Sequence, residues 1–234
     1  MNRTLKLPER LDRIAAFIKK GASVVDVGTD HGLLPIYLAQ SGLAERIIAS
    51  DVSAGSLGAA RRAASKYGVT DAIKFIEMSG LDGIFETDAD TVVIAGMGGQ
   101  NIAEIIRGAP WLKRRKVRLI LQPQSKTDDL CSFLRSAGYT VCDAEIVRDR
   151  SRYYVIFVAI AGKPKSPLPP DIELYSILAA KRSPLFINYV DMLITKTQSA
   201  AAGLINSDPE RYEVLHKKLT DLHSVKRAYS VWQM

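Results

Sequence analysis

Ser23-Val-Val-Asp-Val-Gly-Thr-Asp-His-Gly-Leu-Leu-Pro-Ile36 is the stretch that decides the fold. An apolar, β-branched run breaks at Gly28 and a helical pattern begins after Gly32, which predicts a buried parallel strand, a tight turn and a helix N-terminus. Glycines in the turn let a ligand approach the backbone, and the N–H groups of the new helix point toward the same place. A glycine turn between two core elements is the plainer interpretation. Three polar side chains favour a ligand site in this crevice: Asp26, Asp30 and His31.

The composition is ordinary for a soluble globular protein and leaves room for one large α/β domain with a smaller appendage. The chain has 234 residues, of which 47% are hydrophobic and 24% charged. No apolar run approaches the roughly 20 residues of a membrane span, and the N-terminus lacks the apolar core of a secretory signal. We therefore expect a cytoplasmic protein without membrane contact. Two cysteines without CxxC spacing and three scattered histidines give no reason to expect a metal site.

The net charge of +7 is concentrated in the middle of the chain. Residues 1–106 carry 11 basic and 13 acidic residues, whereas residues 107–152 carry 11 basic and only 5 acidic ones. The excess gathers at Lys113-Arg-Arg-Lys116 and at Arg148-Asp-Arg-Ser-Arg152. Clustered positive charge favours a phosphate-bearing partner, although a solvated basic face would have the same composition.

Strand and helix patterns alternate along the first two thirds of the chain. After the opening strand, further strands are expected at about 46–52, 73–78, 91–97 and 118–123, with helices at about 8–20, 33–40, 53–67, 99–107 and 127–137. The segments 139–147 and 153–161 also read as strands, but the gap between them is too short for a crossover helix. They should therefore be antiparallel neighbours. The pattern predicts a doubly wound α/β sheet with one reversed strand near its end.

The C-terminal third is expected to form a separate, entirely helical domain. Residues 162–170 are rich in proline and lysine and read as a linker, which places the domains at 1–162 and 163–234. Apolar residues then recur every three or four positions along two segments, as in a coiled-coil seam. Residues 206–209 provide a turn between them, so an antiparallel helical pair is predicted. Such stripes are more often core packing than a cofactor site.

Asp51 lies at the end of the second strand, where it can accept hydrogen bonds from both hydroxyls of an adenosine ribose. An acidic residue there would also serve NAD. However, Gly28-x-Asp30-x-Gly32 is not the GxGxxG pattern, and a terminal hairpin is not a usual ending for a dinucleotide-binding domain. Both features resemble class I S-adenosylmethionine-dependent methyltransferases, a Rossmann-like fold.

This resemblance implies a set of residues that bind S-adenosyl-L-methionine. The first motif of that superfamily, an acidic residue and a glycine-rich turn, corresponds to Asp26-Val-Gly-Thr-Asp-His-Gly32, with Asp30 in place of the usual middle glycine. The ribose would lie at the end of the second strand and the adenine beyond the third. The implied cofactor-binding residues are Asp26, Gly28, Asp30, His31, Gly32, Asp51, Val52, Glu77, Met78, Ser79, Gly80, Gly96 and Met97.

Three motifs in order narrow the resemblance to the bacterial TrmK family. They are the stretch at 26–32, Ala-Gly-Met-Gly-Gly at 95–99 and Leu-Gln-Pro-Gln at 121–124. Enzymes of that family methylate N1 of the adenine at position 22 of tRNA, and their fold is a methyltransferase domain followed by a coiled-coil-like domain. The similarity covers essentially the whole chain. It implies tRNA as the partner.

The motif after the fourth strand suggests how the chemistry could work. Adenine N6 methyltransferases usually carry Asn/Asp-Pro-Pro-aromatic there, whereas the bare backbone of residues 96–99 could let a base approach. N1 of neutral adenine already has a lone pair, so positioning should supply most of the rate. We expect a carboxylate to stabilise the cationic product and two polar groups to orient the base, and each of these residues could instead have a structural role. The candidates are Asp30 for the first task and His31 and Gln122 for the second.

Three other functions remain open at this stage. A dinucleotide-dependent oxidoreductase would share the strand, the turn and Asp51. A noncatalytic RNA-binding module would share the basic stretches but would not need the acidic and glycine residues together. A methyltransferase acting on a small molecule or on another RNA would share the first motif, although the basic centre and the helical extension disfavour a small substrate.

Overall fold

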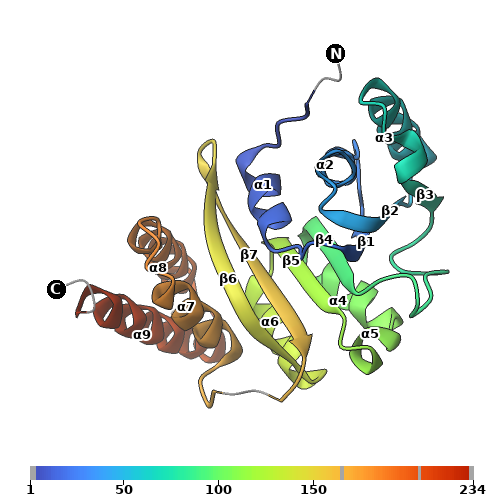
Figure 1. The fold of residues 1–234 in the computed structure, drawn as a ribbon. Helices are drawn as coiled ribbons and strands as arrows, with labels where there is room; N and C mark the ends of the chain where they lie inside the picture. The colour runs from blue at the N-terminus through green and yellow to red at the C-terminus, as the bar shows by residue number, and fades with distance from the viewer. Residues whose placement is uncertain (1–3, 164–165, 205–206, 232–234) are drawn as a thin grey trace.

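The computed structural model describes residues 4–163, 166–204 and 207–231. In this part of the chain a seven-stranded sheet has the order β3-β2-β1-β4-β5-β7-β6 (Figure 1). The strands are β1 Ala22–Val27, β2 Ala44–Asp51, β3 Lys74–Glu77, β4 Thr91–Gly98, β5 Arg118–Ser125, β6 Tyr139–Asp149 and β7 Arg152–Ala161. β1 is buried along its whole length and pairs in parallel with β2 and β4, which confirms the expected central strand.

Helices cover both faces of the sheet. The helices of the first part are α1 Glu9–Ala16, α2 Leu33–Ser41, α3 Ala54–Lys66, α4 Gly99–Gly108, the short α5 Trp111–Arg114 and α6 Thr127–Ser136, and a 3-10 turn spans Thr70–Ala72. Val24 points into the core beneath α1–α3, and its neighbour Val25 points into the core beneath α4–α6. This alternation is the period of a strand that is buried on both faces. Ser53 caps the start of α3, since its hydroxyl accepts a hydrogen bond from the Ser56 N–H.

The terminal hairpin confirms the predicted reversal of the sheet. β5 pairs with β7 in antiparallel register, and β7 pairs with β6 along nearly its whole length. Because β7 runs against β5, the β6–β7 turn lies at the edge where the parallel strands end. The residues of this turn, 149–152, are therefore near the end of β1 rather than its start (Figure 1).

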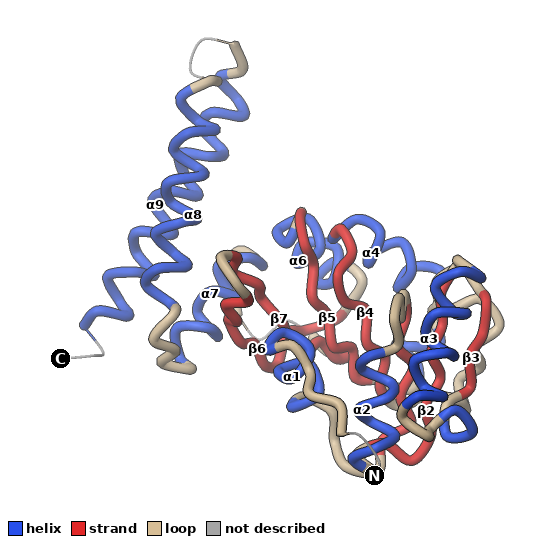
Figure 2. Tube along the Cα trace, turned by 90° about the horizontal axis from the view of Figure 1, so that it is seen from above, coloured by secondary structure: helices blue, strands red, loops and turns tan. Residues whose placement is uncertain are grey.

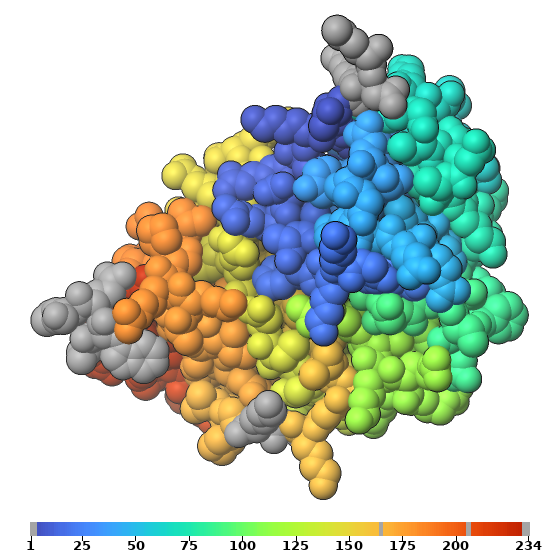
Figure 3. All heavy atoms as spheres, in the orientation of Figure 1, coloured from blue at the N-terminus to red at the C-terminus, as the bar shows by residue number. Residues whose placement is uncertain are grey.

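The C-terminal part contains α7 Pro170–Ala180, α8 Phe186–Ala202 and α9 Pro209–Val231. α7 was not resolved as a separate helix by the sequence pattern. It packs on α6 and β6, and its Tyr175 belongs to the same hydrophobic core as β4 and β5. In the face shown in Figure 3, the start of the C-terminal part, coloured orange, lies against the hairpin side of the sheet. The 162–170 stretch, of which 164–165 lie outside the described residues, therefore divides the chain without dividing the hydrophobic core.

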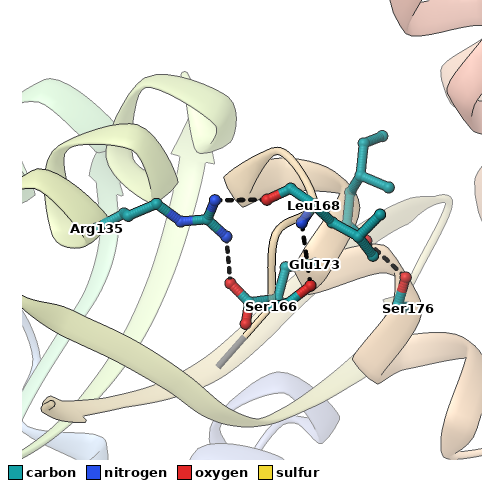
Figure 4. Close-up of polar contacts among 6 residues, drawn as sticks. Arg135, Ser166, Leu168, Glu173 and Ser176 are labelled. Atoms are coloured by element: carbon teal, nitrogen blue, oxygen red, sulfur yellow. Dashed lines mark hydrogen bonds and ion pairs between the residues drawn. The ribbon is translucent and has the colours of Figure 1, made fainter. Parts of the chain in front are cut away.

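Arg135 of α6 fixes the start of α7. Its guanidinium donates to the Leu168 carbonyl and, at 2.6 Å, to the Glu173 carboxylate (Figure 4). The Arg135 and Glu173 side chains are largely buried, with exposed fractions of 24% and 13%. A charge pair that is shielded in this way holds its geometry better than a surface pair. The first helix of the C-terminal part is thus anchored to the sheet domain.

Beyond α7, α8 and α9 form the predicted antiparallel pair and project away from the sheet (Figure 2). The apolar seam is buried where the pair meets the body, at Leu222 and Tyr229, and only half-buried toward Tyr212. The expected turn at 206–209 falls partly outside the described residues. Within the described residues, no helix is both long and apolar enough to cross a bilayer.

Candidate active site

A cleft of about 1130 Å³ lies at the edge of the sheet where the parallel strands end. The residues that follow β1, β2, β3 and β4 line it, together with the start of α1 and the β6–β7 turn. From β1 the sheet continues to β2 and β3 on one side, and from β4 it continues to β5 on the other. The cleft therefore opens at the switch point between β1 and β4, where the strand order reverses. Open α/β sheets bind their ligands at this point.

The turn after β1 needs glycine at two positions for different reasons. Gly28 has φ +73°, and a Cβ there would lie 2.3 Å from the Met97 methyl group. Gly32 has φ +69° at the start of α2, and its Cβ would lie 2.9 Å from that of Ala60. Gly28 therefore brings bare backbone to the cleft, whereas Gly32 lets α2 approach α3 and does not line the cleft itself.

Asp26 is a buried carboxyl at the inner end of the cleft, with 6% of its surface exposed. Burial raises its pKa from 3.8 to about 6, which outweighs the opposing attraction of the Arg10 guanidinium. A carboxylate in such a place is stabilised by any cation that enters the cleft. The arrangement suits a ligand with an ammonium group.

Asp51 is oriented by two backbone N–H groups. One of its oxygens accepts from Ser53 N at 2.9 Å, and the other accepts from Asp30 N at 3.2 Å. An ionised carboxylate has about four acceptor positions, so two hydrogen bonds leave capacity for two ligand hydroxyls. The carboxylate lies in the cleft wall beside Val52, whose side chain is 69% exposed.

Asp30 and His31 stand at the mouth of the cleft. Their side chains are 73% and 69% exposed, and His31 Nε2 lies 3.8 Å from the Asp30 carboxylate. Asp30 has φ +50°, a left-handed conformation that aspartate tolerates better than most residues. Both side chains line the cleft and are free to turn toward a ligand.

Gln122 lies beneath the cleft and is completely buried. Its amide oxygen accepts a hydrogen bond of 2.7 Å from Arg10, and the Arg10 guanidinium lies 5.6 Å from the ring centre of Tyr154. Arg10 and Tyr154 line the cleft, whereas Gln122 does not. In this structure Gln122 therefore supports Arg10 and does not line the cleft, and its expected role in orienting the base stays a prediction.

The turn after β3 lines the cleft, whereas the last side chain of β3 does not. Glu77 is exposed and pairs in register with Asp51, but it does not line the cleft. The residues after it do, and Gly80 packs against Ile105 of α4. The cofactor residues expected from sequence that line the cleft are Asp26, Gly28, Asp30, His31, Asp51, Val52, Met78, Ser79, Gly80, Gly96 and Met97.

The two basic stretches lie at opposite edges of the sheet. Arg150 and Arg152 line the cleft. The run at 113–116 precedes β5 and so lies at the edge where the parallel strands begin, near α5 in Figure 1. Lys113 donates to a backbone carbonyl at 3.0 Å, and Arg114 lies 3.7 Å from Glu86. Only the hairpin stretch can act at the cleft.

Some cleft residues had no sequence signal. They come from the start of α1, from α4 and from the start of β7, where nothing in the local pattern separates a cleft residue from a solvated one. These residues are Pro8, Arg10, Leu11, Asn101, Glu104, Ile105 and Tyr154. Gln124 also lines the cleft, and it belongs to the Leu-Gln-Pro-Gln motif.

Comparison with known proteins agrees with this geometry. A methyltransferase-domain family model matches residues 7–157. A tRNA (adenine(22)-N(1))-methyltransferase of Bacillus subtilis is 30% identical over 223 residues, which are 93% of this chain and 94% of the relative. The chain belongs to this family of methyltransferases.

Solved structures of the family have the same fold. The Bacillus subtilis M1A22 tRNA methyltransferase TrmK superposes with a TM-score of 0.80 at 27% identity, over 95% of this chain and 99% of that one. Sp1610 of Streptococcus pneumoniae, a candidate tRNA (m1A22) methyltransferase, is 30% identical in its complex with S-adenosyl-L-methionine. Its TM-score is 0.81, and the match covers 94% of this chain and all of that one. The similarity to these structures thus extends through the C-terminal helices.

Proposed function

We propose that the protein transfers a methyl group from S-adenosyl-L-methionine to N1 of the adenine at position 22 of tRNA. The observation that carries this proposal is the match to the Bacillus subtilis enzyme along nearly the whole of both chains. The cleft supports it independently, because carboxylates and bare glycine backbone meet at the switch point. As tRNA is the substrate, we also propose that the protein acts in the cytoplasm.

The residues of the cleft fit S-adenosyl-L-methionine. The turn at Gly28 presents bare backbone to the cleft, and Asp51 offers free acceptor positions for ligand hydroxyls. We assign Asp26 to the ammonium group, Asp51 to the ribose hydroxyls and residues 78–80 to the adenine border. Small-molecule pockets usually measure about 300–1000 Å³, and the cleft at about 1130 Å³ has room for the cofactor and one substrate base.

The proposed reaction requires little acid–base chemistry from the protein. The cofactor supplies a methyl group on a positively charged sulfur. The adenine N1 lone pair forms the new C–N bond as the C–S bond breaks, so the positive charge passes to the base. The task of the protein is to hold the base in line and to exclude water. Asp30 at the cleft mouth can stabilise the cationic base, and His31 can help to orient it.

The substrate side of the cleft is formed by Arg10, Tyr154 and the turn at 149–152. Arg150 and Arg152 can contact the phosphates that flank the target nucleotide. We retain residues 1–162 as the methyltransferase domain and 163–234 as a helical domain that helps to hold tRNA. We propose this division for function only. It is not a division of the hydrophobic core, because α7 shares the core of the sheet domain.

A methyl-transfer assay with subsequent nucleoside analysis tests the proposal. Unmodified tRNA transcripts with adenine at position 22 should yield 1-methyladenosine, and transcripts with guanine there should yield none. Transfer of label to both transcripts equally would contradict the assigned position. Formation of N6-methyladenosine, or no transfer to any tRNA by protein that binds the cofactor, would contradict the assigned reaction.

A further inference from the structure

The Leu-Gln-Pro-Gln motif places two amides in different environments. Gln122 is buried and bound to Arg10, whereas Gln124 is exposed and lines the cleft. The Gln124 amide nitrogen lies 3.5 Å from the position that a Cβ on Gly96 would occupy. Gly96 has φ +77° and no side chain, and an Arg10 guanidinium nitrogen lies 3.9 Å from the same position, so the Gln124 amide and Arg10 lie together above the end of β4.

The proposed reaction limits which edge of the base the protein can read. N1 has to face the methyl group, so it cannot serve as a recognition contact. The N6 amino group and N7 remain available on the neighbouring edge. A glutamine amide matches this pair, because its oxygen accepts from N6–H and its nitrogen donates to N7. No other base offers the same donor and acceptor in this arrangement.

We propose that Gln124 is the residue that selects adenine, by pairing its amide with N6 and N7 of the target base. This inference rests on the proposed function and adds the residue that sets base specificity. Methylation at N1 spreads positive charge onto N6, so the hydrogen bond from N6–H to the amide oxygen strengthens as the reaction proceeds. The other cleft amide, Asn101, lies on α4 in the same segment as Ile105, which packs against Gly80 on the side assigned to the cofactor adenine.

The experiment compares tRNA that carries adenosine at the target position with tRNA that carries 7-deazaadenosine there. The second base keeps N1 and N6 but replaces N7 by C–H. The deaza ratio is kcat/KM on the 7-deazaadenosine tRNA divided by kcat/KM on the adenosine tRNA. This ratio should be about tenfold lower for wild-type protein than for Gln124→Ala. In Gln124→Ala the two substrates should differ only by their intrinsic reactivity, and kcat/KM on adenosine should be about tenfold or more below that of wild type. Intrinsic differences in N1 basicity are common to both proteins and cancel in this ratio.

Two further variants make the test specific. Gln124→Glu keeps the acceptor for N6 but places an oxygen against N7, so it should react faster with the deaza substrate than with adenosine. Gln198→Ala removes an exposed glutamine of α8 and should leave the ratio of the two substrates as in wild type. Equal deaza ratios in wild type and Gln124→Ala would overturn the assignment, as would a changed ratio in Asn101→Ala. Failure of wild-type protein to methylate the adenosine substrate would instead refute the proposed function.

Discussion

At the scale of single residues, the cleft keeps a carboxyl in a place where its charge is unfavourable. The pKa of Asp26 is about 6 in the folded protein, against an ordinary value of 3.8, and the main cause is burial. The folded state therefore binds the proton more tightly than the unfolded chain does. Stability contributed by this group rises as the pH falls from about 6 to about 4, and its charge is a cost at neutral pH. Ligand binding is the reason to retain it.

We predict that Asp26→Asn stabilises the cofactor-free protein at pH 8 and weakens S-adenosyl-L-methionine binding. A pKa change from 3.8 to about 6 corresponds to an upper limit of about 3 kcal/mol. The advantage should shrink as the pH falls through 6 toward 4, where wild-type Asp26 becomes protonated in both states. Urea denaturation at several pH values measures the first effect and calorimetry the second. A stability difference that does not vary with pH would contradict the assignment.

The contact between Gln122 and Arg10 gives a second prediction at this scale. Gln122→Leu should reduce kcat/KM on tRNA by about as much as Arg10→Met, because each change removes the same 2.7 Å hydrogen bond and the same placement of the guanidinium. The double variant should then be no worse than either single one, as residues that act as a unit are not additive. We expect each loss to correspond to about 1–3 kcal/mol. Fully additive losses would mean that Gln122 acts independently of Arg10.

At the scale of elements, the strands were predictable because each is a short apolar run with local boundaries. The terminal hairpin was predictable because a few residues cannot span a crossover. The different environments of Gln122 and Gln124 were not, since strict alternation would place both side chains on one face. Both amides in fact lie near Arg10, but Gln122 is covered by the rest of the fold whereas Gln124 lies nearer the exposed end of β5. This difference in burial depends on tertiary packing, which no local pattern reveals.

The two basic stretches lie on different elements, at opposite edges of the sheet, and this yields a third prediction. Replacing Arg150 and Arg152 by serine should weaken tRNA binding and make it less dependent on salt, with the slope changing by about one for each phosphate contact that is lost. The matched change at Arg115 and Lys116, at the opposite edge, should alter the slope less. Filter binding at a series of salt concentrations measures both. If the second pair of substitutions had the larger effect, the tRNA would follow a path that avoids the cleft edge.

At the scale of the whole molecule, the C-terminal helices are more firmly joined to the sheet domain than their linker suggested. Lys218 of α9 forms ion pairs with Asp128 of α6 and Asp171 of α7. Lys181 and Lys226 are likewise engaged, with acidic partners on β6 and α8. Three lysines of the C-terminal part therefore hold the protein together. The sequence gives the number of basic residues, but only the fold shows which of them remain available to tRNA.

The last prediction separates tRNA binding from this structural role. A variant in which residues 200–214 are replaced by a short glycine turn removes the outer part of the projecting pair and keeps Lys218, Leu222 and Tyr229 at its base. It should fold and bind S-adenosyl-L-methionine as wild type does, because the cleft is untouched. Its kcat/KM on tRNA should fall about tenfold, or about 1.4 kcal/mol, because the tRNA loses the projecting surface of α8 and α9. Phosphate contacts contribute little to this loss, since the removed segment holds one cation, Arg211, against three carboxylates.

Lys218→Met provides the contrasting case. It leaves Asp128 and Asp171 without their shared cation, and breaking a partly buried pair in this way should lower the free energy of unfolding by about 1–3 kcal/mol. At a temperature where this variant stays folded, its kcat/KM on tRNA should be close to that of wild type. Thermal denaturation and initial rates on one tRNA transcript measure the two effects together. If the shortened pair methylated tRNA with wild-type kcat/KM, the projecting helices would serve only to buttress the sheet.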